Sequence, residues 1–381
     1  MAVSYTQWID YLFAKSRGTG TPFSGTFELT SRCNLDCRMC YIHKRQNDRE
    51  AMKRELPAAV WLEIAAAAQK QGMLLLLLTG GEPLLRKDFK ELYTGLRRLG
   101  ILLSINTNGT LITQEMVDFF KADRPLRVNL TLYGASPETY ERLCGDASAY
   151  DRAYRAVDML LQAGIRVKLN YSATPENIAD LPAVYAYARA RGLVIQTASY
   201  MFPPIRACEM CEFSTDRLTP EESAQIKWEY ELFRAGDNLA GLETRAEALL
   251  AGKPAPSPDS ECQELPTEKI RCRAGDTTFW VTYAGEMRPC GMMSTPTVDV
   301  LSMGFAEAWK ATGKARSEIM FPAKCTTCEK RNACELCPAV CYAETGSFTG
   351  VPEYLCRRTE CSLARMEAWL KERKNRDESE S

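Results

Sequence analysis

The stretch TSRCNLDCRMCY, residues 30–41, places Cys33, Cys37 and Cys40 in the spacing C-x3-C-x2-C. An iron–sulfur cube usually takes four thiolates. Three thiolates would leave one iron without a protein ligand, and an open coordination position is typical of a catalytic rather than a structural metal. We therefore expect a small molecule to complete the site, and the surrounding sequence indicates which fold holds it.

Apolar and β-branched runs alternate with helical segments through the first half of the chain. We expect strands at 26–30, 73–79, 101–106, 127–132, 165–171 and 193–199. The helical segments between them end at glycines, and one begins with Ser136 as its N-cap and Pro137 at its first position. Apolar strands separated by helices predict an α/β fold with a parallel sheet covered on both faces, here a partial (β/α)6 barrel.

Polar and glycine-rich segments follow the first four predicted strands. The cysteine loop follows the first, TGGEPLL the second, NTNGT the third and YGASPE the fourth. In parallel α/β folds the loops at the carboxyl ends of the strands form the functional site. We therefore expect these four segments to meet at one end of the barrel.

The cysteine triplet followed by Tyr41, together with the sequence GGEP at 80–83, resembles the radical S-adenosylmethionine superfamily over roughly residues 25–200. The resemblance implies a [4Fe–4S] cluster whose open iron is chelated by S-adenosylmethionine. Reductive cleavage of that molecule yields a 5′-deoxyadenosyl radical, which abstracts hydrogen from a substrate. A zinc site or incidental buried cysteines would be the alternative for the triplet alone.

The same resemblance implies cofactor contacts along the four loops. Glycines let a ligand approach the backbone closely, Glu82 would supply the anionic partner for the methionine ammonium, and Arg142 would clamp a carboxylate. Asn108 and Thr131 lie where the family places ribose and carboxylate contacts. The expected cofactor-binding residues are Tyr41, Gly80, Gly81, Glu82, Asn108, Thr131 and Arg142.

Ten of the 16 cysteines lie between Cys262 and Cys361. Their spacing resembles the SPASM domain, which usually holds two auxiliary [4Fe–4S] clusters. By that resemblance one cluster takes Cys325, Cys328, Cys334 and Cys356. The other takes Cys272, Cys290 and Cys337, with Cys262 a candidate fourth ligand and Cys341 a spare or a substitute for Cys337. A pair of zinc ribbons is the alternative, because C-x2-C also binds zinc.

Composition changes along the chain predict its domain organisation. We expect an N-terminal extension (1–24), the barrel and its following helices (25–250), a linker rich in proline, alanine and serine (251–260), the SPASM domain (261–365) and a charged tail (366–381). The SPASM domain shows few clear helices in its sequence, and the charged tail is expected to fray. A capping box at Thr219–Glu222 begins another helix before the linker.

Charge and histidine content exclude several classes of function. The net charge is −1 and the pI is about 6.2, which argues against a nucleic-acid partner or an anionic membrane surface. The longest apolar run, 73–78, is too short to cross a bilayer, so we expect a cytoplasmic protein. The single histidine, His43, makes histidine-rich zinc catalysis and a Ser-His-Asp triad improbable.

The resemblance to SPASM proteins, which include maturases of ribosomally made peptides, implies hydrogen abstraction from a peptide or protein substrate. Thioether or carbon–carbon crosslinking, epimerisation and related oxidations are the candidate outcomes, with ferredoxin or flavodoxin as reductant. Only 32 residues precede the cysteine loop, so a separate leader-binding protein is a candidate partner.

Three other readings stay open. One is a small-molecule radical enzyme that acts on haem precursors or alcohols. Another is a sulfatase-maturase-like enzyme. In sulfatase maturases an aspartate that serves as base follows the corresponding SPASM cysteine, and Gly291 follows Cys290 here, which disfavours this class. A non-enzymatic iron–sulfur or zinc scaffold would have no need for GGEP beside an incomplete cysteine set.

Four cysteines have no predicted ligand role. Cys144, like His43, reads as a structural or surface residue. Cys208 and Cys211 precede a helix near the expected mouth of the barrel, where they would form a redox pair, contact substrate or have no function. Cys361 has no assigned role.

Overall fold

The computed structural model describes residues 5–42, 44–202, 217–255, 270 and 272–380. Its centre is a nine-stranded sheet in the order β11-β10-β9-β1-β4-β5-β6-β7-β8. All neighbours from β9 to β8 are parallel. The six predicted barrel strands are present, at β1 (Ser24–Glu28), β4 (Leu75–Thr79), β5 (Leu102–Thr107), β6 (Arg127–Leu132), β7 (Val167–Ser172) and β8 (Val194–Ala198). The predicted fold class, α/β with a partial barrel, is therefore confirmed.

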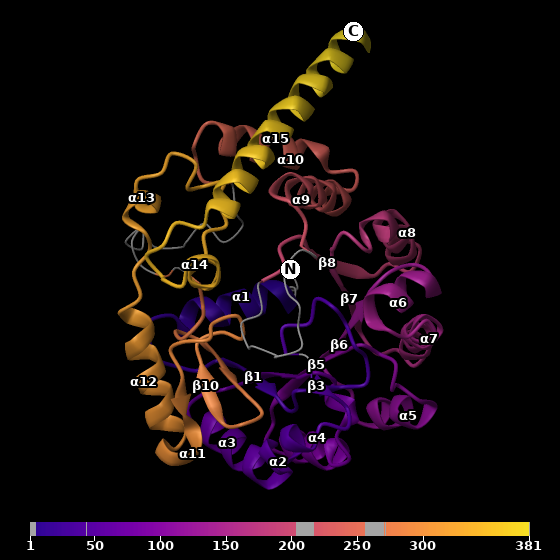
Figure 1. The fold of residues 1–381 in the computed structure, drawn as a ribbon, viewed down its shortest axis with the longest axis vertical. Coiled ribbons are helices and arrows are strands. Elements are labelled where there is room, and N and C mark those ends of the chain that lie inside the picture. The colour runs from indigo at the N-terminus through magenta and orange to yellow at the C-terminus, as the bar shows by residue number, and fades with distance from the viewer. Residues whose placement is uncertain (1–4, 43, 203–216, 256–269, 271, 381) are drawn as a thin grey trace.

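Helices connect these strands and cover the outer side of the curved sheet (Figure 1). The helix that begins after Ser136 shows why the sequence folds this way: the Ser136 hydroxyl accepts a hydrogen bond from the Thr139 amide, and Pro137 occupies the first turn. The connecting helices are α3 (Ala58–Lys70), α4 (Phe89–Arg98), α5 (Gln114–Ala122), α6 (Pro137–Cys144), α7 (Ala149–Gln162) and α8 (Leu181–Ala190), with short 3-10 turns at Pro83–Leu85 and Ile178–Asp180.

The two faces of the sheet differ in polarity. Leu103 and Ile105 of β5 are fully buried, and Phe27 of β1 packs against Trp61 of α3 with ring centroids 4.5 Å apart. On the other face, the Asn129 side chain of β6 donates to the Asn106 side chain of β5 at 2.7 Å. Alternation along each strand thus leaves polar groups facing the interior of the barrel.

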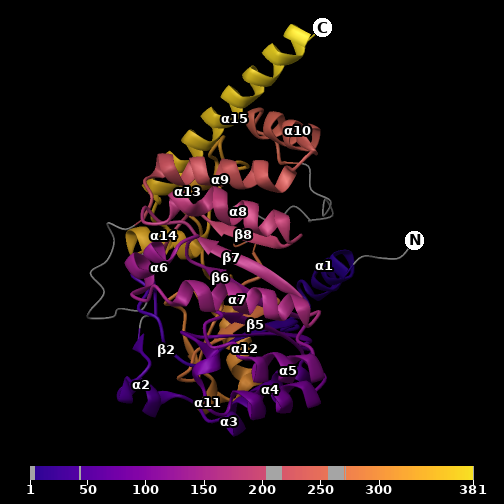
Figure 2. The same cartoon turned by 90° about the vertical axis from the view of Figure 1, so that its right-hand side faces the viewer.

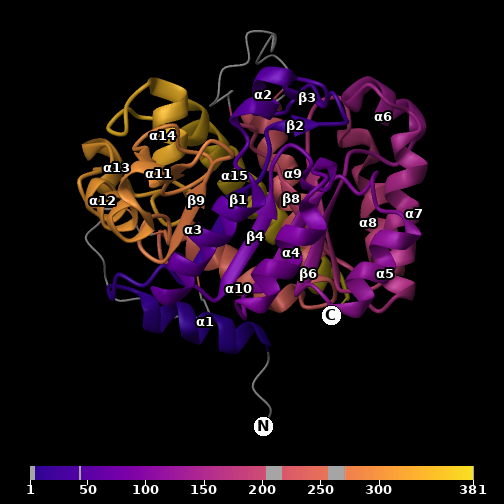
Figure 3. The ribbon, with the colours of Figure 1, turned by 90° about the horizontal axis from the view of Figure 1, so that it is seen from below.

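The C-terminal half of the chain extends the same sheet. Strand β9 (Thr278–Val281) pairs in parallel with β1, and β10 (Glu286–Arg288) and β11 (Val298–Asp299) continue from it in antiparallel fashion. Figure 3 shows the C-terminal helices α12–α14 beside this end of the sheet, opposite α5–α8. The helices are α11 (Val300–Met303), α12 (Phe305–Ser317), α13 (Ala323–Thr326), α14 (Pro338–Thr345) and α15 (Glu353–Glu380), so the cysteine-rich region is more helical than its sequence predicts.

A helical layer joins the two halves. Helix α9 (Pro220–Ala235) begins at the predicted capping box of Thr219 and Glu222, and α10 (Leu239–Leu250) ends where the predicted linker starts. Of that linker only residues 251–255 lie within the described ranges.

Helix α15 packs along α9 and α10 (Figure 2). It continues through the segment that was expected to fray. Met366 and Leu370 are buried, and the Trp369 ring lies 5.3 Å from that of Trp228 in α9. These apolar residues recur at helical spacing, which the surrounding charges obscure in the sequence. Among the described helices none is both long enough and apolar enough to cross a bilayer.

Candidate functional site

The cysteine loop leaves β1 and is anchored on the end of α6. Cys33 lies in the short strand β2 (Arg32–Cys33), which pairs with β3 (Lys44–Arg45). The amides of Asp36 and Arg38 donate to the carbonyls of Cys144 and Leu143, each at 3.0 Å. Carbonyls in the last turn of a helix have no partner within the helix, so the loop satisfies them. Cys37, between these two contacts, is buried, whereas Cys33 and Cys40 are half-buried.

The GGEP segment, residues 80–83, packs directly on the start of the cysteine loop. The Gly81 amide donates to the Thr30 carbonyl at 2.7 Å, and the Glu82 amide donates to the Arg32 carbonyl at 2.8 Å. A Cβ on Gly80 would lie 2.4 Å from the Thr30 oxygen, and one on Gly81 would lie 2.3 Å from the Arg32 oxygen. The close approach that requires glycine here is therefore an approach of the cysteine loop itself.

Glu82 joins GGEP to the loop after β5. Its buried carboxylate accepts from the Thr107 hydroxyl at 2.9 Å, from the Asn108 amide at 2.8 Å and from the Leu84 amide at 3.0 Å. Burial raises the pKa of Glu82 to about 7, although these hydrogen bonds act in the opposite direction. The structure gives Glu82 a positioning role, and its contact with a methionine ammonium remains a prediction.

Asn108 directs its side-chain amide at the first cysteine. Its Nδ2 lies 3.6 Å from the Cys33 sulfur and donates to Asn34 Oδ1 at 3.0 Å. The Asn108 Oδ1 accepts from the Thr110 amide at 2.9 Å, which fixes the orientation of the side chain. The structure thus brings Asn108, predicted as a cofactor contact, to the sulfur of a cluster ligand.

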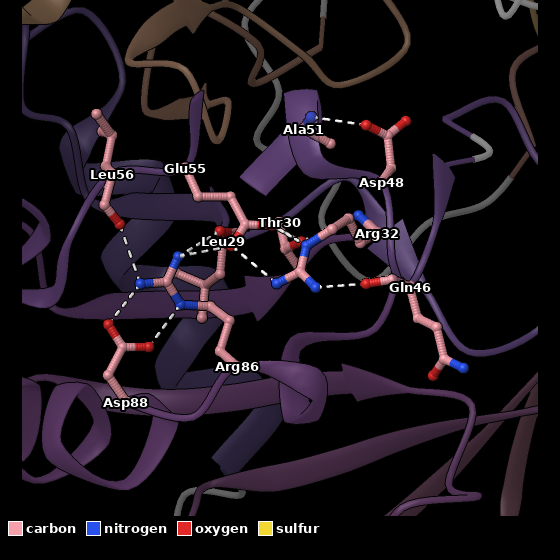
Figure 4. A network of polar contacts seen from close by, with 10 residues as sticks. All are labelled: Leu29, Thr30, Arg32, Gln46, Asp48, Ala51, Glu55, Leu56, Arg86 and Asp88. Carbon is pink, nitrogen blue, oxygen red and sulfur yellow. Dashed lines mark hydrogen bonds and ion pairs between the residues drawn. The ribbon is translucent and has the colours of Figure 1, made fainter. Parts of the chain in front are cut away.

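A network of buried charges holds the cysteine loop on its other side (Figure 4). Arg32 donates to both carboxylate oxygens of Glu55, at 2.7 and 3.1 Å, and Thr30 also donates to Glu55. The Arg32 guanidinium donates to the Gln46 carbonyl at 2.6 Å as well. Glu55 is the C-cap of α2 (Arg49–Arg54), so the network fixes this helix to the loop.

Arg86 extends the network to the segment after GGEP. Its guanidinium donates to the Leu29 carbonyl at 2.8 Å and to the Leu56 carbonyl at 3.0 Å. It also pairs with Asp88 at 2.6 Å and lies 3.9 Å from Glu55. Both flanks of the cysteine loop are therefore tied to charged groups, none of which we predicted from the sequence.

The remaining predicted cofactor contacts are less closely tied to this group. Thr131 is half-buried near the carboxyl end of β6, and Tyr41 is half-buried beside Cys40. The Arg142 side chain is 52% exposed and pairs with Glu176 at 3.5 Å. A cofactor carboxylate at Arg142 would therefore compete with Glu176, and all three contacts remain predictions.

The cysteine thiols of the loop lie in surroundings that disfavour bare thiolates. Burial and then the charge of Glu82 raise the pKa of Cys33 far above its ordinary value. A hydrogen bond with Cys144 and then burial raise the pKa of Cys37. Iron ions would supply the positive charge that makes thiolates stable in such a place. The three residues thus fit a cationic iron–sulfur cluster.

The structure gathers a second set of cysteines near the start of α15. Burial raises the pKa of the Cys325 thiol most. The negative charges of Cys356, Cys334 and Cys328 raise that pKa further, which they do because these three thiols lie near Cys325. Cys325 lies in α13 and Cys356 in α15, so one short helix and one long helix position this set. These are the four residues assigned from their spacing to one auxiliary cluster.

A third set lies next to the second, around a cavity of about 280 Å³ that Cys272, Cys334 and Cys337 line. Cys290 and Cys337 pack on the same small apolar cluster. Cys341 is buried, and burial followed by the charges of Cys325 and Cys337 raises its pKa to about 12. Cys341 therefore lies between the two predicted ligand sets.

No three His, Cys, Asp or Glu side chains in the described part of the chain converge closely enough to hold one metal ion. A zinc ion needs such convergence, with sulfur ligands at about 2.3 Å, whereas each thiolate of a cube binds a different iron.

The remaining cysteines fall into two groups. Cys144 is buried beneath Cys37 rather than exposed, and Cys361 contacts Glu221 at 3.7 Å. Cys208, Cys211, Cys262 and His43 lie outside the described residues.

Residues 27–188 match the family model described as the Radical SAM superfamily. This segment is a radical SAM domain. The resemblance to the radical S-adenosylmethionine superfamily, predicted from the cysteine loop and GGEP, is therefore confirmed. The chain is accordingly an enzyme with a radical SAM domain, and enzymes with this domain use a [4Fe–4S] cluster and S-adenosylmethionine.

Two solved structures show that the fold similarity includes the C-terminal half. Streptococcus suis SuiB bound to its precursor peptide SuiA has a TM-score of 0.68 at 18% identity, covering 88% of this chain and 76% of that one. The protein anSMEcpe with bound AdoMet has a TM-score of 0.60 at 17% identity, covering 92% and 100%. At these identities the likeness concerns the fold alone, and it extends over both the barrel and the cysteine-rich C-terminal region.

A curated relative is similar over almost its whole length. The AdoMet-dependent heme synthase of Methanosarcina barkeri is 25% identical over 357 residues, which cover 89% of this chain and 98% of the relative. The radical SAM domain and the C-terminal region of this chain are thus both represented in that protein.

Several residues that support the radical SAM site were not found from the sequence. Arg32 and Arg86 lie beside the two motifs, but their shared partner Glu55 is more than 20 residues from either and belongs to no motif. The sequence around Cys144 does not predict that this residue contacts Cys37, because the contact depends on how α6 packs against the cysteine loop. Only Asn34, inside the cysteine loop, could have been proposed from its place between Cys33 and Cys37.

Proposed function

We propose that this enzyme generates a 5′-deoxyadenosyl radical at a cluster bound by Cys33, Cys37 and Cys40 and abstracts hydrogen from a carboxylate-bearing substrate. The observation behind the proposal is the seating of the three thiols on GGEP, with the Asn108 amide directed at Cys33. The cluster and S-adenosylmethionine would supply the radical chemistry. The protein would hold the ligands, exclude water and keep one coordination position open.

The residues of the barrel have distinct tasks in this proposal. Asn108 donates a hydrogen bond to the Cys33 sulfur, which favours a more reducible cluster. Glu82 keeps the GGEP backbone in place beneath the cysteine loop. Tyr41, Thr131 and Arg142 contact the bound S-adenosylmethionine, and Arg142 leaves Glu176 to do so.

Two auxiliary [4Fe–4S] clusters complete the proposal. Their ligands would be Cys325, Cys328, Cys334 and Cys356 in one, and Cys272, Cys290 and Cys337 in the other, with Cys262 as its candidate fourth ligand and Cys341 as a spare or a substitute for Cys337. The proximity of the first four thiols and the cavity beside Cys272 and Cys337 support this assignment. The clusters would pass electrons to or from the substrate, with ferredoxin or flavodoxin as the external carrier in a cytoplasmic enzyme.

A tetrapyrrole that bears carboxylates is the first candidate substrate. The support is the similarity to a heme synthase along nearly the full length of both chains. A peptide is the second candidate, and its support is the fold shared with SuiB, which was solved with a precursor peptide. A separate leader-binding protein is a partner only in the peptide case.

The first test is chemical. Iron, acid-labile sulfide and zinc are measured on protein reconstituted without oxygen, and 5′-deoxyadenosine is measured after reduction in the presence of S-adenosylmethionine. About twelve iron and twelve sulfide per chain, with 5′-deoxyadenosine formed, are expected for three cubes. About four iron with two zinc would reject the auxiliary clusters, and zinc without iron would reject the proposed activity.

The second test separates the substrates. Reconstituted enzyme is incubated with iron-coproporphyrin III or with short peptides encoded beside its gene, and products are followed by mass spectrometry. Loss of carbon dioxide from the porphyrin supports the first candidate. A mass change in a peptide alone supports the second.

A further inference from the structure

A cavity of about 310 Å³ lies where the cysteine loop meets the β9–β10 hairpin. Ser31, Lys44 and Arg54 line it from the side of the barrel, and Glu286 and Arg288 line it from the hairpin. We call it the basic pocket. Neither the cluster ligands nor the predicted cofactor contacts line it, so it is a separate site.

Positive charge dominates the basic pocket. Among the described residues that line it, three side chains are basic, Lys44, Arg54 and Arg288, and one is acidic, Glu286. Arg288 is buried and its Nη2 lies 2.8 Å from Glu286, so this pair is neutral overall. Lys44 and Arg54 remain as two cations without an acidic partner on the part of the lining that the structure describes. An anion entering the pocket would therefore be attracted rather than repelled.

The basic pocket also offers hydrogen-bond donors in a fixed arrangement. The Arg54 guanidinium lies 5.6 Å from the centre of the Tyr283 ring, which holds its planar fork against the hairpin. Ser31 is 1% exposed, and its hydroxyl has no hydrogen-bond partner among the described residues. Buried hydroxyls are normally paired, so an unpaired one that lines a cavity indicates a missing acceptor.

The pocket lies between the radical-generating loop and the C-terminal region. Ser31 precedes Cys33 by two residues, and Arg288 precedes Cys290, a predicted auxiliary ligand, by two. Arg288 pairs with Trp280 of β9, whose indole donates to Glu28 at the end of β1 at 3.0 Å. A molecule anchored here would extend from a point beside both cysteine sets.

We propose that the basic pocket binds a carboxylate group on one arm of the substrate. Arg54 would bind it through its guanidinium fork, Lys44 as a point charge and Ser31 as a neutral donor. The volume is at the lower limit of ligand pockets, which are about 300–1,000 Å³, so it suits one arm rather than a whole macrocycle. This inference rests on the proposed function and identifies the group by which the substrate is held.

The test uses reconstituted holoenzyme with Lys44→Gln and Arg54→Gln combined. The matched control is Lys53→Gln, because Lys53 is exposed on the same helix as Arg54, does not line the described part of the pocket and pairs with Glu50 at 2.7 Å. Iron content and circular dichroism verify that the variants fold and load. Affinity is measured for two probes, iron-coproporphyrin III and hexaglutamate, with the porphyrin tetramethyl ester as a probe that lacks carboxylates.

Loss of at least about tenfold in affinity for one acidic probe in the double variant, with Lys53→Gln unchanged, supports the proposal. A loss confined to the porphyrin assigns the carboxylate to a tetrapyrrole, and one confined to hexaglutamate assigns it to a peptide. Equal affinity of the double variant and wild type, equal affinity for acid and ester, or no binding of either acidic probe to wild type would overturn it. In each of these cases 5′-deoxyadenosine formation by wild type still decides the proposed function separately.

Discussion

The two cysteine-rich regions of this enzyme differ in how far protein contacts hold their cysteines in place. Backbone contacts from α6 and GGEP and the buried network around Glu55 hold the loop of Cys33, Cys37 and Cys40. In the C-terminal region Cys272 and Cys328 are exposed, and Cys325 lies in a helix of four residues. The difference indicates that the protein preorganises the site that must keep an open iron. In the other region bound metal would contribute to the folding itself.

The sharpest test of this contrast is Cys33→Ala. Removing one of three ligands should abolish 5′-deoxyadenosine formation, because residues 30–41 contain no fourth cysteine to replace it. About eight of twelve iron should remain, since the C-terminal ligands are untouched. Iron analysis and product quantification check both parts. The control is Cys361→Ala, which should retain full activity, and cofactor cleavage by Cys33→Ala would disprove the ligand assignment.

Breaking the buried network should cost stability even without metal. Glu55→Ala leaves the buried guanidiniums of Arg32 and Arg86 without their shared partner, so we expect a loss of about 3–5 kcal/mol in the free energy of unfolding. Urea denaturation of the apoprotein measures this loss. Glu50→Ala removes an exposed acid from the same helix and should change stability by less than about 0.5 kcal/mol. Similar losses in both variants would mean that the loop is not preorganised.

The pH dependence of stability should report the burial of Glu82. Its pKa is raised from 4.5 to about 7 in the folded protein, so the folded state binds more protons than the unfolded state between these values. The contribution of Glu82 to the free energy of unfolding is therefore greatest below pH 4.5. It falls by up to about 3 kcal/mol as the pH rises to about 7. Urea denaturation of the wild type and of Glu82→Gln across this range measures the difference. A difference that does not change with pH would show that Glu82 is not buried as described.

Removal of the metal should change amide hydrogen exchange to different extents in the two regions. Hydrogen exchange of apoprotein and reconstituted protein is compared by mass spectrometry. We expect amides around 325–356 to exchange at least about tenfold faster without metal, which corresponds to about 1.4 kcal/mol. Amides at 30–38 should change less, because their hydrogen bonds come from protein groups. Equal acceleration in both regions would reject the contrast.

The features that could be predicted from the sequence are those that depend on short segments of the chain. Strand positions, the helix start at Ser136 and the capping box at Thr219 depend on neighbouring residues, and the structure reproduces them. The network of Glu55 depends on residues far apart in the chain, and so does the pairing of β9 with β1 across about 250 residues. Helix α15 was missed for another reason: its charges outnumber the few apolar residues that bury it.

The pairing of β9 with β1 has a consequence for how the enzyme can be divided. If the chain ended after α10, residues Ser24–Phe27 would lose their partners Thr278–Val281 and β1 would become an edge strand. Phe27 and its neighbours would present unpaired backbone groups beside an apolar face, a template on which other chains can align. An isolated barrel should therefore be prone to aggregation, and engineering or expression of this enzyme should treat β1 and β9 as one inseparable element.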